Sequence, residues 1–315
     1  MLRRAAFVGV AMALSLAIPA AAQQQERTVA TRNFDRFELD SDSVTGFWAE
    51  AGSLFQRTNK NHITDTSIGT FAYPGLYSGP IGTKLISGAD KKDVDVTTTF
   101  ARFAYGGDKW EGNLFVPYRQ LNGEFRSGGN VTDIDENGIG DIQLAAKYVP
   151  VRSGLLDLGV GALLSLPSGD DNRRLGGGAF GGAPFITGAM HFALLDIHAH
   201  LAPEFFAGWH TNGQASDRFL YGFDFLVPLC KYAALRNEFS AVDNYDLNNS
   251  PKTMSYLPGL DIRVPIGDMD LLLRPTGSVG LTNDSPTWGF GGSIAITSPT
   301  MRAAAAKTVG GVVVE

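Results

Sequence analysis

The chain has 315 residues, with 26 Lys and Arg against 32 Asp and Glu, so its formal net charge is −6. An acidic chain is a poor ligand for the phosphates of nucleic acids, and we expect no nucleic-acid partner. The single cysteine, Cys230, can form no intrachain disulfide, which excludes a small disulfide-stapled secreted scaffold.

The first residues have the layout of an export signal. Arg3 and Arg4 precede an apolar run that ends at Ile18, and three alanines stand directly before Gln23. A positive start, a short apolar stretch and small residues at a cleavage point are typical of a secretory signal peptide. The run is too short for a membrane-spanning helix, which needs roughly 20 apolar residues. We therefore expect residues 1–22 to be removed on export.

The long central part of the chain alternates apolar and polar residues at period two. In the segment 155–167, Leu158 and Val160 fall on one face of a strand and Asp157 on the other. An apolar outer face and a polar inner face are typical of an antiparallel transmembrane β-barrel. About 12 segments have this character. The predicted strands are 44–56, 92–105, 109–119, 139–150, 155–167, 182–194, 197–210, 217–229, 232–244, 253–266, 269–282 and 286–298.

This pattern divides the chain without any linker between domains. We expect four parts: the signal peptide at 1–22, a periplasmic leader at 23–43, the barrel at 44–298 and a C-terminal tail at 299–315.

The connections between predicted strands alternate strictly between very short and mostly longer ones. Bacterial outer-membrane barrels have this asymmetry, with short periplasmic turns and long external loops. The two longest predicted loops are 57–91 and 120–138, and the second contains the acidic stretch 133–138. We expect the first loop to act as a lid or partial plug, or alternatively to pack on the outer rim, because it carries several apolar side chains. These predicted lid residues are Ile68, Phe71, Tyr73, Leu76 and Tyr77.

If the apolar faces contact lipid, the opposite faces line the interior. These faces carry charges of both signs, and a buried charge is costly unless it is paired or hydrated. The interior could be a permeation path or ligand pocket, or it could be a charge network that fills and braces a narrow barrel. The predicted lumen-lining residues are Asp141, Lys147, His198, His200, Glu204, Arg218, Asp224, Arg236, Glu238, Asp261, Arg263, Asp270 and Arg274.

Two histidines of this set raise the question of a metal. His198, His200 and Glu204 share one face of a predicted strand, and two imidazoles with a carboxylate can bind Zn²⁺. The same groups also suit a network of hydrogen bonds to water, since a neutral imidazole both donates and accepts. No third histidine lies on the inner face of that strand. We therefore expect the network, and neither a metal nor another cofactor.

Catalysis is the rival class of function. An outer-membrane lipid hydrolase would need an outward-facing Ser paired with a His, whereas His198 and His200 are predicted to point inward. The sequence also contains no Gly-x-Ser-x-Gly motif. We expect no enzymatic activity, with a lipid hydrolase as the alternative within this class.

Two stretches resemble a known family. Residues 137–148, Asn-Gly-Ile-Gly-Asp-Ile-Gln-Leu-Ala-Ala-Lys-Tyr, and the run from Val279 to Gly291 are similar to a strand opening and the last hairpin of the outer-membrane barrels grouped as the "MetA-pathway of phenol degradation" or transporter-like family. The resemblance implies a barrel in the outer membrane of a Gram-negative cell that takes up small, often aromatic or hydrophobic solutes. A non-conducting structural or ligand-holding barrel is the alternative.

The resemblance also implies partners. They are membrane lipid, a small solute and the outer-membrane assembly machinery, which usually reads an aromatic residue at the end of the last strand. This chain departs from that pattern, because its last predicted strand ends near Ile296 and the tail follows.

Overall fold

The structure is a computed structural model. It describes residues 46–66, 86–107, 109–127, 129–152, 155–170, 173, 175–176, 178–192, 195–207, 218–230, 232–244, 252–267, 269–282 and 285–297. The predicted signal peptide, leader, C-terminal tail and lid residues Ile68 to Tyr77 lie outside these ranges. Among the described residues, no helix is long and apolar enough to cross a membrane.

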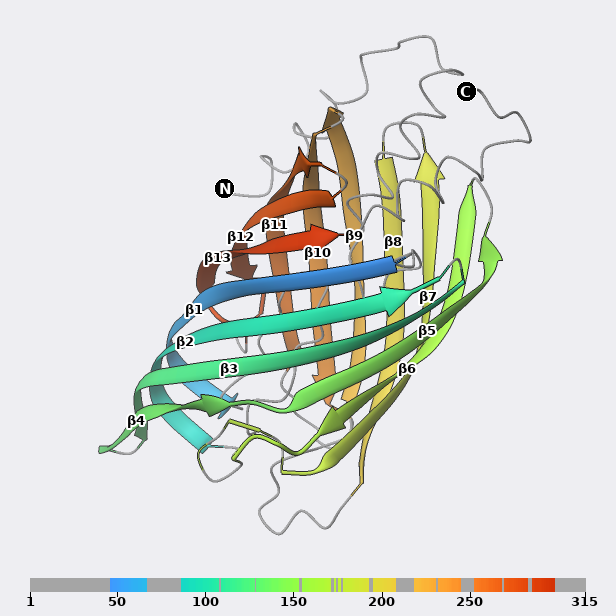
Figure 1. The fold of residues 1–315 in the computed structure, drawn as a ribbon. Helices are drawn as coiled ribbons and strands as arrows, with labels where there is room; N and C mark the ends of the chain where they lie inside the picture. Colours follow the sequence, from blue (N-terminus) through green and yellow to red (C-terminus); the bar gives the residue numbers. More distant parts are fainter. Residues whose placement is uncertain are drawn as a thin grey trace, which may run out of the picture.

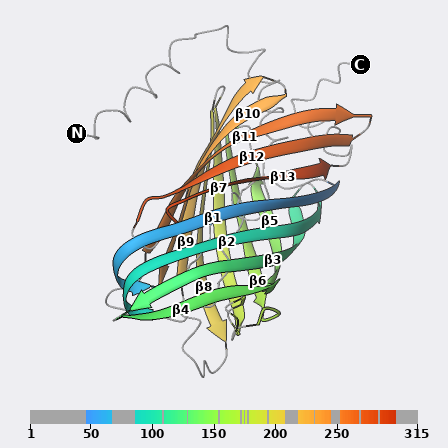
Figure 2. The ribbon, with the colours of Figure 1, turned by 90° about the vertical axis from the view of Figure 1, so that its left-hand side faces the viewer.

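The described chain forms one antiparallel sheet that closes on itself. Its strands are β1 (Gly46–Thr66), β2 (Ile86–Gly106), β3 (Trp110–Ser127), β4 (Asn130–Ile139), β5 (Ile142–Arg152), β6 (Leu156–Leu166), β7 (Phe180–Phe192), β8 (Leu195–Ala207), β9 (Arg218–Cys230), β10 (Ala233–Asn244), β11 (Lys252–Ile266), β12 (Met269–Gly280) and β13 (Trp288–Thr297). β1 pairs with β2 on one side and with β13 on the other, which joins the two ends of the sheet. The strands wrap around a common interior (Figures 1 and 2).

The barrel wall has 12 strand positions around its circumference, as the sequence predicts. We call each position a stave, and β4 and β5 together fill one of them. β3 pairs with β5 over Trp110–Phe115 and with β4 over Tyr118–Ser127. The bend between the two strands lies at Gly140, whose N–H donates to the carbonyl of Pro117 at 2.9 Å. The Gly-x-Gly-Asp stretch of the sequence is therefore the point at which this stave bends.

The wall has the inverse of a soluble protein's distribution of side chains. Val160 and Ile186 are 49% and 56% exposed, whereas Asp157 is 0% exposed. Large apolar side chains exposed all around the outer surface would cause aggregation in water. Lipid is the solvent that suits such a surface. The alternation of burial along β6 and β7 repeats this pattern residue by residue. The predicted fold class, an antiparallel transmembrane β-barrel, is confirmed.

The predicted loops 57–91 and 120–138 are wrong over most of their described length. β1 continues to Thr66 and β2 begins at Ile86, and β3 and β4 form a hairpin that reaches Asn130. We call the outer parts of these four strands, 57–66, 86–95, 120–127 and 130–138, the extension; Figures 1 and 2 show the long curved strands to which it belongs. Its strands carry polar residues on both faces, so they show no apolar alternation although their backbones pair.

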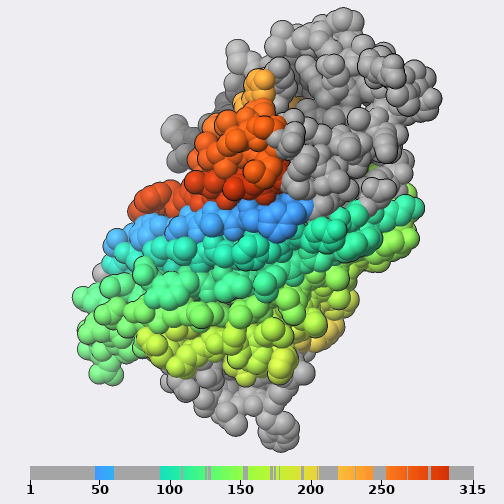
Figure 3. Space-filling view, in the orientation of Figure 1, coloured from blue at the N-terminus to red at the C-terminus, as the bar shows by residue number. Residues whose placement is uncertain are grey.

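Gly123 on β3 shows how tightly the extension is paired. Its φ is +150°, and a Cβ atom there would lie 2.1 Å from the carbonyl oxygen of Asp93 on β2. A side chain at this position would therefore force the two strands apart. The space-filling view shows β13, β1, β2 and β3 side by side as a continuous wall (Figure 3).

Candidate functional site

The interior of the barrel gathers most of the predicted lumen residues. The structure buries Asp141, Lys147, His198, Asp224, Arg236, Glu238, Asp261, Asp270 and Arg274. His200 is half-buried on β8, and its ring lies over Gly222, where a Cβ atom would be 2.7 Å from His200 Cε1. Arg263 is also half-buried and pairs with Asp270 at 2.5 Å. Glu204 and Arg218 are opposite each other in the β8–β9 register, and their side chains are outside the description.

A chain of ion pairs crosses the inner face from β9 to β11. Arg236 on β10 contacts Asp224 on β9 at 3.1 Å and Asp261 on β11 at 2.9 Å. All three residues are at most 5% exposed. Placing one guanidinium between two carboxylates on neighbouring strands compensates charges that would otherwise be costly to bury.

The series of ion pairs continues to β1 and β13, the two strands whose pairing closes the barrel. Arg274 on β12 contacts Asp261 and Glu50, each at 3.7 Å. Glu50 on β1 in turn contacts Arg102 on β2 at 3.1 Å and accepts a hydrogen bond from Ser293 on β13. We call the set Asp224, Arg236, Asp261, Arg274, Glu50 and Arg102 the ion-pair belt. It connects six staves through side chains on the inside of the wall.

One aromatic side chain lies within the belt. Trp48 on β1 is 0% exposed, and the guanidinium carbons of Arg274 and Arg102 are 4.7 Å and 5.7 Å from its ring centroid. Its Nε1–H donates to Glu50 at 3.3 Å. Cations over an indole face are attracted to its negative face, so the ring and the two arginines hold one another in place.

Three members of this group were not predicted from the sequence: Trp48, Glu50 and Arg102. The signal that could have found them is period two, because Trp48 and Glu50 share one face of β1 and Arg102 is paired opposite Glu50. Assigning the inner face of the first two strands as systematically as that of the later ones would have placed all three in the interior.

Asp141 is buried beside the bend between β4 and β5. Its carboxylate accepts a hydrogen bond from the N–H of Gly169 at 3.0 Å, and thereby holds the β6–β7 connection against the bend at Gly140. In the same connection Leu175 is 1% exposed and packs with Val94 and Leu121 of the neighbouring strands. Leu175 of this connection therefore packs on the extension, whereas the predicted lid residues of 57–91 lie outside the description.

Glu136 on β4 and Arg173 of the β6–β7 connection also pair, at 2.7 Å. The hydrogen bond from Arg173 to Glu136 raises the pKa of this exposed guanidinium above its usual value. The pair links the connection to the extension.

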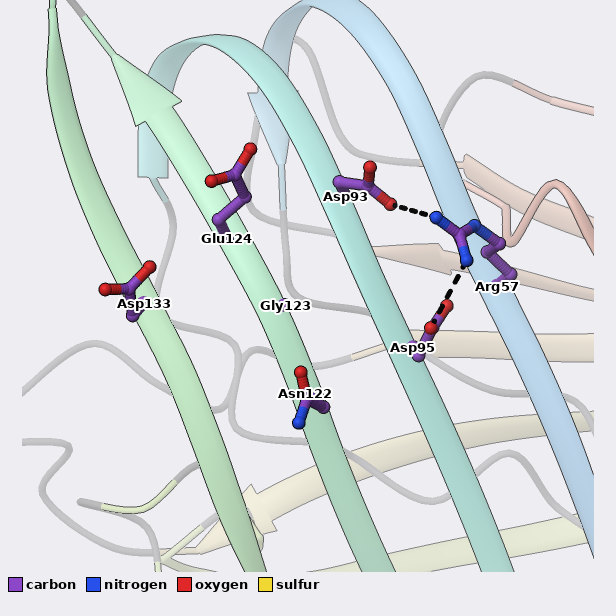
Figure 4. Close-up of a pocket in the computed structure, with 7 residues that line it drawn as sticks. All are labelled: Arg57, Asp93, Asp95, Asn122, Gly123, Glu124 and Asp133. Carbon is purple, nitrogen blue, oxygen red and sulfur yellow. Dashed lines mark hydrogen bonds and ion pairs between the residues drawn. The ribbon is translucent and has the colours of Figure 1, made fainter.

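A polar cavity of about 320 Å³ lies on the extension, away from the belt. Arg57 contacts Asp93 at 3.0 Å and Asp95 at 3.4 Å across the β1–β2 pair (Figure 4). The other lining residues come from β3 and β4: Asn122, Gly123, Glu124 and Asp133. The predicted acidic loop at 133–138 is wrong, since these residues belong to β4.

The closed wall, apolar outside and charged inside, defines the class of the protein as an outer-membrane β-barrel, and the chain is placed in the outer membrane of Gram-negative cells, in contact with lipid. A family described as "Putative MetA-pathway of phenol degradation" matches residues 65–184, which confirms the resemblance seen in the sequence. The match includes the stretch 137–148 and ends before the run at Val279.

One solved structure shows the same fold. The chain is similar to the COG4313 outer membrane channel from Pseudomonas putida F1, with a TM-score of 0.54 and 12% identity over 84% of this chain and 98% of that one. There is a weaker likeness to a Pseudomonas aeruginosa FadL homologue, with a TM-score of 0.40 and 9% identity over 81% of this chain and 90% of that one. A search of curated proteins finds no match.

Proposed function

We propose that this protein is a narrow outer-membrane channel for the uptake of small solutes. The observation that carries the proposal is the closed barrel whose apolar face points outward while ion pairs from six staves meet inside. A wall of this kind spans lipid and offers a polar route through it. The chain also shares its fold with the COG4313 outer membrane channel.

The solute class that we propose is small aromatic compounds with a polar group, of which phenol is the simplest. The family description names phenol degradation. The interior combines ion pairs with buried aromatic rings, since Phe100 and Phe115 lie 5.4 Å apart and Trp48 lies beside two arginines. Aromatic and cationic groups together suit a ring that carries a hydroxyl.

A second candidate is a non-conducting structural or ligand-holding barrel. The observation that favours it is the burial of the belt: Arg102, Arg236 and Arg274 are each at most 2% exposed. Side chains packed this closely brace the wall and narrow the path at this level. Conduction would then require Trp48 or the arginines to change position.

We propose transport rather than catalysis, because the imidazole of His198 is buried inside the wall and does not face lipid. A lipid hydrolase would need its nucleophile and base on the lipid-facing side. We also propose that the outer-membrane assembly machinery inserts the barrel into the membrane.

The experiment that tests the proposal measures ion selectivity in planar bilayers. Replacing Arg236, Arg263 and Arg274 together with Gln leaves the carboxylates of the belt in excess. Fixed charge in a pore decides which ions enter, so the zero-current potential in a salt gradient should shift toward cation selectivity. Arg57→Gln is the control, because Arg57 lies on the extension and its loss should leave the selectivity unchanged.

Uptake of phenol into liposomes separates the two candidates. A channel takes up phenol faster than protein-free liposomes and carries current, and Trp48→Ala should increase the conductance. Wild-type protein that folds, carries no current and gives no uptake would favour the non-conducting barrel. Heat-modifiable migration on gels serves as the check that each variant is folded.

A further inference from the structure

Three side chains of kinds that can bind a metal ion lie close together on the inner wall. None of them belongs to the ion-pair belt. His191 on β7 and Asp196 on β8 lie directly opposite each other across the short turn that joins the two strands, and His198 is two residues beyond Asp196 on the same face. One ligand atom of each residue lies within 4.8 Å of the others. The three residues are 3%, 0% and 1% exposed, so they form an interior cluster.

Carboxylates also approach the histidines from neighbouring strands. His191 Nδ1 is 3.3 Å from Asp196, while its Nε2 is 3.5 Å from Asp157 on β6. His198 Nδ1 is 3.8 Å from Asp224 on β9. In metal sites, a ligating histidine almost always directs its second ring nitrogen to a carboxylate, a carbonyl or water, which fixes the ring and raises its basicity.

The charge on Asp196 requires a positive partner. Among the described residues, neither of its carboxylate oxygens accepts a hydrogen bond, and Asp196 forms its ion pair with His191. A fully buried carboxylate is costly unless a cation lies beside it. A divalent metal between Asp196 and the two imidazoles would supply that charge, and so would protonation of the histidines.

We propose that His191, Asp196 and His198 form a binding site for a divalent transition metal of the zinc class. Two imidazoles and one carboxylate suit Zn²⁺ and its first-row neighbours, whereas Ca²⁺ and Mg²⁺ prefer sites built from oxygen alone. His191 would bind through Nδ1 and His198 through Nε2, with Asp157 and Asp224 holding the opposite nitrogens. The site would connect β7 and β8 at the end of the barrel that carries the short turns. This inference is independent of the proposed transport.

This set differs from the one that the sequence suggested. His200 and Glu204 were the companions of His198 that the sequence suggested. The two residues that join His198 are instead His191 on the neighbouring strand and Asp196, which precedes His198 on β8. The sequence of a single strand could not reveal this set, because it is the register between β7 and β8 that places His191 opposite Asp196.

The test uses the full mature chain, folded in detergent micelles and stripped with a chelator. Zn²⁺ bound after gel filtration, measured by inductively coupled plasma spectrometry, should reach one equivalent per chain. Co²⁺ should give the visible absorption of a tetrahedral or five-coordinate site. Binding should weaken at acid pH, because protons compete for the imidazoles. A wild-type chain that binds no stoichiometric Zn²⁺ or Co²⁺ overturns the proposal and leaves protonated histidines as the countercharge.

Variants locate the metal. His191→Gln and His198→Gln should each weaken Zn²⁺ binding at least tenfold, whereas the matched control His200→Gln should bind like the wild type. Because a glutamine variant can fail to fold, His191→Cys provides a positive signal: a bound Co²⁺ should then show a thiolate charge-transfer band in the near ultraviolet. Binding that survives both glutamine variants, or a cobalt spectrum that lacks this band in folded His191→Cys, contradicts the site.

Discussion

The wall of the barrel and the extension are continuous sheet, yet they obey different rules. In the wall, Arg236 lies between Asp224 and Asp261 with all three buried. In the extension, Arg57 also contacts two carboxylates, Asp93 and Asp95, both of them on β2, but its side chain is 37% exposed (Figure 4). The backbone pairing is alike, and the difference lies in the surroundings of the side chains. Alternation at period two therefore reports where a strand faces lipid, and it does not report where a strand ends.

The two arginines provide the sharpest test of this difference. Arg236→Gln should destabilise the barrel by about 3–5 kcal/mol, because it removes the guanidinium that lies between the buried carboxylates of Asp224 and Asp261. Arg57→Gln should cost at most about 1 kcal/mol, because water and salt already screen an exposed pair. Unfolding in urea, followed by loss of heat-modifiable migration, measures both. Equal costs would mean that the interior is as well hydrated as the extension.

Two exposed valines test the outer face in the same way. Val160 on β6 and Val131 on β4 are 49% and 53% exposed. Val160→Arg should cost about 2–4 kcal/mol if it lies near the membrane midplane. Val131→Arg should cost less than about 1 kcal/mol even though Arg126 lies opposite, because water solvates the new guanidinium. Refolding into lipid vesicles at increasing urea concentration compares the two, and a costly Val131→Arg would place the extension within lipid.

An effect smaller than those at Arg236 and Val160 is expected for a glycine within the extension. Gly123→Ala brings a Cβ atom against the carbonyl of Asp93, and should cost on the order of 1–2 kcal/mol, confined to the β2–β3 hairpin. Gly182→Ala is the control, since a Cβ atom there meets nothing within 4 Å. Hydrogen exchange should accelerate around Asp93 and Gly123 while exchange of β6 to β13 stays unchanged. Faster exchange throughout the barrel would show that the extension and the wall unfold as one unit.

Much of the fold followed from the residues alone. The faces of β6 and β12 were predicted correctly, with Asp157 and Arg274 inside and Val160 and Val279 outside. The number of staves was also predicted, although β4 was taken for a loop. That error has a clear cause: Ile134 is buried, but its neighbours on both sides along β4 are exposed and polar, so the segment carries little apolar signal.

The candidate site was only partly accessible to the sequence. Inward-facing charges such as Asp224, Arg236 and Asp261 were predicted from alternation, but their pairing needed the register between strands. The seam between β1 and β13 is the extreme case, because the hydrogen bond from Ser293 to Glu50 joins residues from opposite ends of the chain.

The sequence by itself determined that each strand has one face for lipid and one for the interior, because side chains alternate along any strand regardless of its partners. Only the tertiary structure decided which interior charges meet. Closure of the sheet brings Glu50 to Arg274, and the register of one hairpin brings His191 to Asp196. Contacts between strands depend on register and closure, and neither is encoded in the pattern of a single strand.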